Sequence, residues 1–319
     1  MSRVTIAFLL ALAWLVPTAA LAADTANCNL KIVNTVPIVM TNEGRRALVP
    51  VTINGTQKEF LLDTGGALTQ VSAAAAEELK LPLAESGVRM LDLYGNASTG
   101  AAKIDTFQLG RLTDRNTWLP LSTLFREGGR VSGILAADYM GKYDIELDFA
   151  GGKMNYFSSD HCPGKVVYWP AAAIAVVPIL FGDMQHLVLD VTLDGHHLRA
   201  MIDTGATSTT LSMKEAKRVF DIAAEDKDKD FEHIFQKLSF EGLEVSNPHI
   251  VVIPDKVGSK DPNNSFVTGS RVHRVDDNDP LDPVMLIGMN ILSKLHLYIA
   301  FSERKIYITP ASAPAQTRQ

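Results

Sequence analysis

Phe60–Gly65 reads FLLDTG, and Ala200–Gly205 reads AMIDTG. In each copy an apolar stretch typical of a buried β-strand leads into an Asp-Thr-Gly turn. The upstream residues repeat as well, since Val51–Gly55 (VTING) corresponds to Val191–Gly195 (VTLDG) at the same spacing of 203 − 63 = 140. One such tripeptide would mean little, because Asp and Gly are common turn residues. Its duplication together with the strand predicts two matching units that share a pair of carboxylates.

The repeat continues downstream of the turns. Ile134–Met140 corresponds to Leu286–Leu292, and Asp144–Phe149 corresponds to His296–Phe301. Both matches keep a spacing of 288 − 136 = 152, so the second unit has about 152 − 140 = 12 extra residues between its landmarks. The period is much longer than that of solenoid repeats, and there are only two copies. The pattern indicates a duplicated domain.

These segments resemble the aspartic proteases, specifically the retropepsin-like units. The family pattern is an apolar strand, Asp-Thr-Gly, and later an apolar-apolar-Gly segment, which Leu286–Gly288 matches in the second unit. In the first unit Ala136 stands where this late Gly is expected, and Gly66 follows the tripeptide where many relatives carry a hydroxyl residue nearby. The resemblance covers roughly residues 36–157 and 176–309. It implies a pepsin-like covalent pseudo-dimer, and therefore a monomer.

Only two segments carry helix signals. Ser72–Lys80 and Ser212–Phe220 each open on a Ser that can cap a helix, and each follows the Asp-Thr-Gly turn of its unit. The remaining sequence is typical of short strands and turns. We therefore expect a mainly β, bilobal acid-protease-like fold made of two retropepsin-like β units with short helices.

The resemblance implies a catalytic pair, Asp63 and Asp203. Two carboxylates held close together cannot both ionise easily, so one keeps a proton while the other acts as a base toward water. Such a pair needs neither a metal nor another cofactor. Residues next to the pair would cross-link the two loops by hydrogen bonds or permit their close approach: Thr64 and Thr204 for the first role, Gly65 and Gly205 for the second.

A second signal is Leu93–Gly100, a polar, Gly-flanked tip between strand-like stretches. By resemblance to the pepsin-like flap, Tyr94 and Gly95 would close over a substrate; the alternative is a plain surface hairpin. The corresponding stretch of the second unit, Asp221–Asp230, is charged and has no Gly, which indicates a solvated helix or loop. Pro254–Pro283 is rich in Asp, Asn, Gly and Pro and is expected to be a long solvated loop.

The N-terminus predicts export. Val4–Val16 form an apolar stretch after Arg3 that is too short for a good membrane span, and Pro17 and the small-residue series Ala20-Leu21-Ala22 follow it. This pattern is typical of a signal peptide cut after Ala22. We expect a periplasmic or secreted protein without stable membrane insertion. In an oxidising compartment its two cysteines, Cys28 and Cys162, would form a disulfide bond.

The expected organisation is a signal peptide (1–22), an N-terminal lobe (23–160), a linker (161–175), a C-terminal lobe (176–310) and a tail (311–319). The net charge of −6 argues against nucleic acid as a partner. The sequence favours an exported aspartic endopeptidase acting on peptides or proteins. The alternative is a weakly active or inactive peptide- or envelope-binding module on the same fold, which Gly66 and Ala136 would explain.

Overall fold

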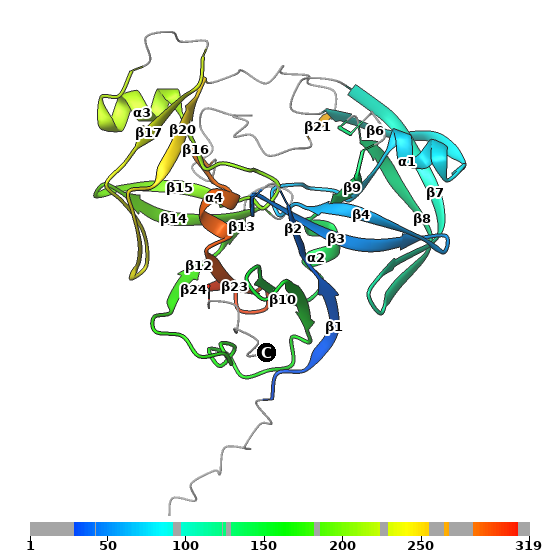
Figure 1. Ribbon diagram of the computed structural model, residues 1–319, viewed down its shortest axis with the longest axis horizontal. Coiled ribbons are helices and arrows are strands. Elements are labelled where there is room, and N and C mark those ends of the chain that lie inside the picture. The colour runs from blue at the N-terminus through cyan, green and yellow to red at the C-terminus, as the bar shows by residue number, and fades with distance from the viewer. Residues whose placement is uncertain are drawn as a thin grey trace, which may run out of the picture.

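The computed structural model describes residues 29–41, 43–91, 97–122, 124–125, 129–181, 186–223, 229–254, 265–267 and 283–311. Within them the chain forms two lobes side by side above a shared sheet (Figure 1). Strands dominate and the four helices found there are short, so the predicted fold class is confirmed. None of those helices is long and apolar enough to cross a membrane.

The N-terminal lobe is built on a nine-stranded sheet. In spatial order its strands are β2 (Val39–Thr41), β3 (Arg46–Ile53), β4 (Thr56–Leu62), β9 (Val131–Leu135), β5 (Gln70–Ser72), β8 (Leu112–Ser122), β7 (Ala97–Leu109), β6 (Leu83–Leu91) and β21 (Ser265–Val267). The last of these comes from the second half of the chain and runs parallel to β6. The segment expected to be a loop between Pro254 and Pro283 thus contains a short strand.

The C-terminal lobe repeats this plan. Its sheet runs β17 (Phe231–Ile234), β20 (His249–Ile253), β16 (Thr210–Ser212), β22 (Met285–Ile287), β15 (His196–Ile202), β14 (Leu187–Leu193), β18 (Lys237–Phe240) and β19 (Leu243–Ser246), with β13 (Leu180–Phe181) beside β14. The hairpins β3–β4 and β14–β15 turn through Asn54-Gly55 and Asp194-Gly195, all four with positive φ. These dipeptides suit the tight turns that match strand twist.

A six-stranded sheet joins the lobes. Its order is β1 (Ile32–Pro37), β11 (Lys153–Phe157), β10 (Asp144–Asp148), β23 (Leu295–Ala300), β24 (Lys305–Pro310) and β12 (Ala175–Pro178). Three strands come from each half of the chain, and β10 pairs with β23 in its middle. Since both strands belong to the segments that repeat at a spacing of 152, the pseudo-twofold relation of the units runs through this sheet.

The helices lie at matching places in the two lobes. They are α1 (Ala73–Glu78), α2 (Ala137–Met140), α3 (Met213–Phe220) and α4 (Met289–Leu292). The hydroxyls of Ser72 and Ser212 accept hydrogen bonds from the third residues of α1 and α3, which confirms both expected helices and their caps. Helix α3 ends at Phe220, and the described residues on either side of 224–228 form no helix.

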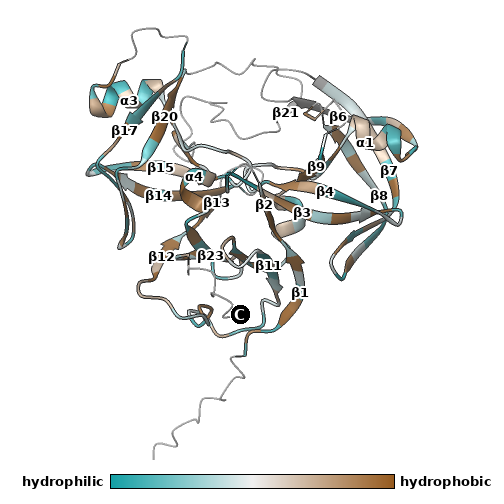
Figure 2. Ribbon diagram, in the orientation of Figure 1, coloured by the Kyte–Doolittle hydropathy of each residue, from teal (hydrophilic) through white to brown (hydrophobic). Residues whose placement is uncertain are grey.

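Apolar side chains of both lobes form one continuous core. Phe60 and Leu62 of β4 point into it, as do Ala200 and Ile202 of β15, and all four are completely buried. Figure 2 shows hydrophobic residues along strands β3, β14 and β15, which run toward the middle of the molecule. Alternation along β4 and β15 therefore sends the neighbouring residues to the opposite face, where each strand ends at its aspartate.

Candidate active site

The two Asp-Thr-Gly turns meet between the lobes. Each follows a strand that runs beside a parallel partner, β4 beside β9 and β15 beside β22. The amide of Asp63 donates to the carbonyl of Leu135 at 2.9 Å, and that of Asp203 donates to the carbonyl of Ile287 at 3.0 Å. These bonds hold both turns in the same way. The two aspartates are 2% and 0% exposed, respectively.

The threonines of the tripeptides cross-link the turns. The hydroxyl of Thr64 donates to the carbonyl of Ile202 at 2.8 Å and accepts from the amide of Thr204 at 3.1 Å. The hydroxyl of Thr204 makes the mirror-image bonds, to the carbonyl of Leu62 at 2.8 Å and from the amide of Thr64 at 3.0 Å. The four buried bonds connect the lobes at the predicted residues.

The glycines of the tripeptides leave room for the opposite aspartate. A Cβ atom on Gly65 would lie 2.6 Å from Cγ of Asp203, and one on Gly205 would lie 2.5 Å from Cγ of Asp63. Real Cβ atoms do not approach other atoms this closely. Each carboxyl group thus packs against the backbone of the other turn, and the two carboxyls lie close enough to share a hydrogen bond.

Burial and hydrogen bonds from backbone amides shift the pKa of Asp63 in opposite directions. The amides of Gly65 and Gly205 donate to the aspartate of their own turn at 3.0 and 2.9 Å, and the amide of Ala206 also donates to Asp203 at 3.1 Å. Burial raises the pKa of Asp63 well above its usual range, and the charge of Asp203 and the hydrogen bond with it raise it further. Asp63 therefore keeps its proton to a higher pH than an ordinary aspartate does.

Two further side-chain pairs support the turns, and the sequence interpretation missed them. Asp138 accepts hydrogen bonds from the amide and hydroxyl of Thr69, at 3.0 and 2.6 Å. In the C-terminal lobe Asn290 accepts the same two bonds from Thr209, both at 2.7 Å. The signal was present, because these residues keep the spacings of 140 and 152 between the units.

Each threonine of these pairs also holds the segment that follows β9 or β22. Its hydroxyl accepts from the amide of Ala136 in one lobe, at 3.0 Å, and from that of Gly288 in the other, at 3.1 Å. The two lobes also share a backbone hydrogen bond next to this segment. The amide of Ala137 donates to the carbonyl of Gly66, and the amide of Met289 donates to the carbonyl of Ala206. The alanine at position 136 therefore leaves the support of the turn intact.

The joining sheet contains two buried pairs of a histidine and a carboxylate. His296 bonds to Glu146 across β23 and β10 at 2.8 Å, and His161 bonds to Asp144. Burial alone would raise the pKa of Glu146, but hydrogen bonds from His296, Tyr168 and Asn155 outweigh it and lower that pKa.

One group of described side chains has donor atoms close enough for a metal ion, namely Glu146, Asp148 and His296. Both oxygens of Glu146 already accept hydrogen bonds from His296, Tyr168 and Asn155. Trp169 stacks on His296 with ring centroids 3.8 Å apart. The group thus serves as a hydrogen-bonded link between the lobes.

Several predicted residues lie outside the described part of the chain: Tyr94, Gly95, Cys28 and the signal peptide (1–22). The flap and the bond between Cys28 and Cys162 therefore remain predictions. No free cysteine is present among the described residues.

Comparison with known proteins agrees with this geometry. Residues 49–139 match the aspartyl protease family, while a sequence search of curated proteins finds no match. Among solved structures the chain is similar to the aspartic proteinase from Irpex lacteus, with 14% identity, 89% of this chain and 99% of that chain covered, and a TM-score of 0.52.

Two plant proteins are also similar. Basic 7S globulin from soybean has 9% identity, with 92% of this chain and 98% of that chain covered and a TM-score of 0.48. Conglutin gamma from lupine seeds has 10% identity, with 86% and 94% covered and a TM-score of 0.48. At its low identity the likeness to the Irpex proteinase shows the fold, which is the bilobal fold of an aspartic proteinase.

Proposed function

We propose that this chain, whose N-terminal lobe matches the aspartyl protease family, is an aspartic endopeptidase that uses Asp63 and Asp203 to hydrolyse peptide bonds. The observation that carries the proposal is the buried carboxyl pair, with each aspartate packed against the glycine of the opposite turn. Thr64, Gly65, Thr204 and Gly205 hold the pair in place.

In the proposed mechanism Asp63, whose pKa is raised, starts as the protonated member of the pair, and Asp203 starts as the carboxylate. Asp203 takes a proton from a water molecule as that water attacks the peptide carbonyl carbon, and Asp63 donates its proton to the carbonyl oxygen. The tetrahedral intermediate then collapses: the C–N bond breaks, Asp203 gives its proton to the leaving nitrogen, and the intermediate hydroxyl returns a proton to Asp63. The pair ends as it began.

The location and the accessory parts follow from the sequence. The N-terminal apolar segment supports export to the periplasm or the outside, with residues 23–160 and 176–310 as the two lobes and a disulfide bond between Cys28 and Cys162. A flap carrying Tyr94 would cover the peptide. A peptide would bind in extended form between the lobes, through backbone hydrogen bonds and side-chain pockets.

The test is cleavage of a mixed peptide library by the purified mature protein at several acidic pH values. Asp63→Asn and Asp203→Asn should each abolish cleavage, and a statine-type peptide should inhibit the parent. Asp105→Asn, an exposed carboxylate on β7, is the control and should cleave as the parent does. A Asp203→Asn variant with undiminished activity would refute the proposal.

The second candidate is a peptide-binding module with little or no catalysis. It is favoured by Gly66 and Ala136, which depart from the family pattern beside Asp63. If the parent binds peptides and the statine-type compound but cleaves nothing in the library at any pH, this candidate replaces the first.

A further inference from the structure

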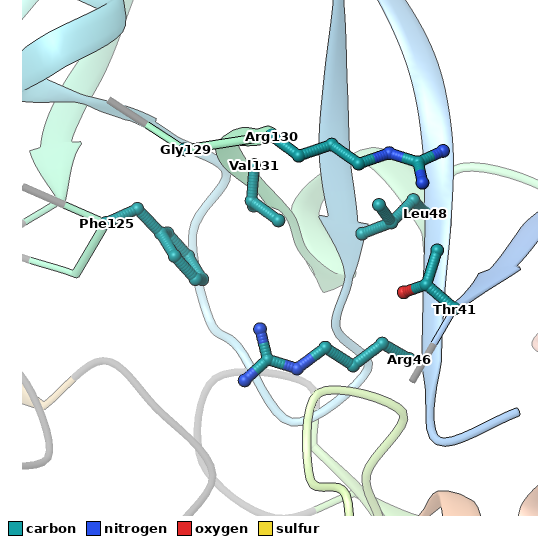
Figure 3. A pocket seen from close by; sticks show the side chains of 7 residues that line it. All are labelled: Thr41, Arg46, Leu48, Phe125, Gly129, Arg130 and Val131. Carbon is teal, nitrogen blue, oxygen red and sulfur yellow. The ribbon is translucent and has the colours of Figure 1, made fainter. Parts of the chain in front are cut away.

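A cavity of about 470 Å³ opens beside β2, β3 and the start of β9. Figure 3 shows its lining, with Arg46 extending from β3 toward Phe125 and Arg130 extending in the opposite direction above Leu48. Phe125, Leu48 and Val131 make most of its walls apolar. The cavity therefore combines an apolar wall with two guanidinium groups.

The register of the strands puts this cavity on the face of the sheet that carries Asp63. Along β4, Phe60 and Leu62 point into the core, so Glu59 and Leu61 point to the other face, on which Asp63 follows. Leu48 pairs with Leu61 across β3 and β4. Arg46 lies two residues before Leu48 on β3, and Asp63 lies two residues after Leu61, just past the end of β4. Arg46 thus lies level with the carboxyl pair.

The two arginines differ in charge balance. Arg130 forms two hydrogen bonds with the carboxylate of Glu59, one of them at 2.9 Å, so its charge is compensated. Arg46 forms no ion pair with any residue in the described ranges. Its side chain is only partly exposed and faces apolar neighbours. Among the described residues the cavity therefore holds one positive charge without an ion-pair partner, in a chain whose net charge is −6.

A side chain that fits this cavity has a carboxylate at its end and a short apolar stem. A guanidinium binds a carboxylate through two parallel hydrogen bonds, which an amide of the same shape cannot match in strength. The methylene groups of a glutamate would contact Leu48, Phe125 and Val131. Because the cavity lies on the catalytic face, a peptide lying across the carboxyl pair can reach it.

We propose that Arg46 makes this cavity a specificity pocket for an acidic side chain of the peptide substrate, near the bond that is cleaved. This inference rests on the proposed peptidase function and adds the substrate class to it.

The experiment compares matched peptides that differ only in Glu, Gln or Leu at one position, scanned along a cleaved sequence. At one position the parent should cleave the Glu peptide about tenfold or more faster than the Gln peptide, as measured by kcat/KM, because a hydrogen-bonded charge pair is lost with Gln. Arg46→Gln should remove that preference, so that the Glu and Gln peptides are cleaved with similar kcat/KM. Arg46→Lys, which keeps the charge but not the paired hydrogen bonds, should fall between them.

Arg45→Gln is the matched control, because it removes the same charge from the neighbouring residue, which pairs with Glu43 outside the cavity. It should keep the Glu preference. Melting curves of all variants establish that each is folded. Cleavage without any Glu preference at any position, or a preference that Arg46→Gln leaves intact, overturns the pocket while leaving the peptidase standing.

A binding arm separates the two proposals. Asp203→Asn should still bind the Glu peptide more tightly than the Gln peptide in fluorescence polarisation, and adding Arg46→Gln should abolish the difference. If the parent cleaves nothing but this difference is seen, the pocket stands and the peptidase falls. If neither cleavage nor the difference is seen, both fall.

Discussion

In the N-terminal lobe Ala136 carries a methyl group and Gly66 carries none, whereas in the C-terminal lobe Ala206 carries the methyl group and Gly288 carries none. The two positions of each lobe touch: a Cβ on Gly66 would lie 3.2 Å from that of Ala136, and one on Gly288 would lie 3.0 Å from the carbonyl oxygen of Ala206. In the N-terminal lobe a methyl group on Gly66 would thus crowd that of Ala136, whereas in the C-terminal lobe the nearest obstacle to a methyl group on Gly288 is the backbone carbonyl of Ser208, at 2.4 Å.

This comparison shows that the two departures from the family pattern occur at positions that touch each other. Gly66 and Ala136 look like separate losses in the sequence, yet in the structure the missing methyl group of one leaves space for the methyl group of the other. The same backbone hydrogen bond joins the two segments in both lobes, at 3.2 Å from Ala137 to Gly66 and at 2.8 Å from Met289 to Ala206. The turns are equivalent in support and differ in side-chain detail.

Of the features that the two turns share, the threonine cross-links should contribute most to the stability of the protein. Thr204→Val would leave the amide of Thr64 and the carbonyl of Leu62 without partners in a buried place, at a cost of roughly 1–3 kcal/mol for each group. Thr64→Val should destabilise by a similar amount, since it breaks the mirror-image bonds. Chemical unfolding of both variants measures this. A large effect of one with none of the other would contradict the pseudo-twofold cross-link.

A change of one methyl group should alter stability by different amounts in the two lobes. A Cβ on Gly288 would overlap the backbone carbonyl oxygen of Ser208, so Gly288→Ala should destabilise by roughly 1–3 kcal/mol. Ala136→Gly only removes a buried methyl group and should cost about 1 kcal/mol.

The control is the double variant Gly66→Ala with Ala136→Gly, which copies the C-terminal arrangement. It should be more stable than Gly66→Ala alone, because the crowding at Ala136 is gone. Additive effects in chemical unfolding would show that the two positions do not compensate each other.

The raised pKa of Asp63 predicts how stability changes with pH. In the unfolded chain an Asp ionises near about pH 3.9, whereas in the folded protein Asp63 holds its proton to a higher pH. Between these two values the folded state binds more protons, so the free energy of unfolding falls as pH rises, by up to about 1.4 kcal/mol per pH unit. The stabilisation is complete below the ordinary value and is lost as pH rises through the folded pKa.

Asp63→Asn should remove this fall, so the variant gains stability relative to the parent as the pH is raised. Urea unfolding of both proteins across the acidic range measures the difference. Asp105→Asn should keep the slope of the parent. A parent that becomes more stable, relative to Asp63→Asn, with rising pH would contradict the burial of the carboxyl pair.

The smallest effect is expected where the lobes differ in charge, at Asp138 and Asn290. Burial raises the pKa of Asp138, and hydrogen bonds from Thr69 and Tyr139 offset part of that shift. Ionisation of Asp138 therefore lowers the stability of the folded state, and this loss grows as the pH rises. Asp138→Asn keeps an oxygen for Thr69 and should raise stability near neutral pH by less than about 1 kcal/mol. Asn290→Asp should lower it, and Asp138→Ala should lower it more, because Thr69 loses its acceptor.

How much could be predicted is clearest along the repeated segments. The strands before Asp63 and Asp203 and the capped helices after them follow from local residue patterns that occur twice, whereas the cross-linking role of Thr64 and Thr204 was implied by the resemblance to the aspartic proteases. Duplication makes such patterns reliable, because chance is unlikely to repeat a strand, a turn and a cap in register. The threonines Thr69 and Thr209 occur in the same register, yet their partners lie on segments far away in the chain.

By itself the sequence determined that two similar β units each end a buried strand on an Asp-Thr-Gly turn, since alternation, turn residues and caps act over a few neighbours. Only the tertiary structure decided that Ala136 lies beside Gly66, that β21 joins the sheet of the other lobe, and that Arg46 lies level with Asp63 and forms no ion pair with the residues that the structure describes. These facts depend on which distant segments touch and on the space left between them, and close packing of the whole chain determines both.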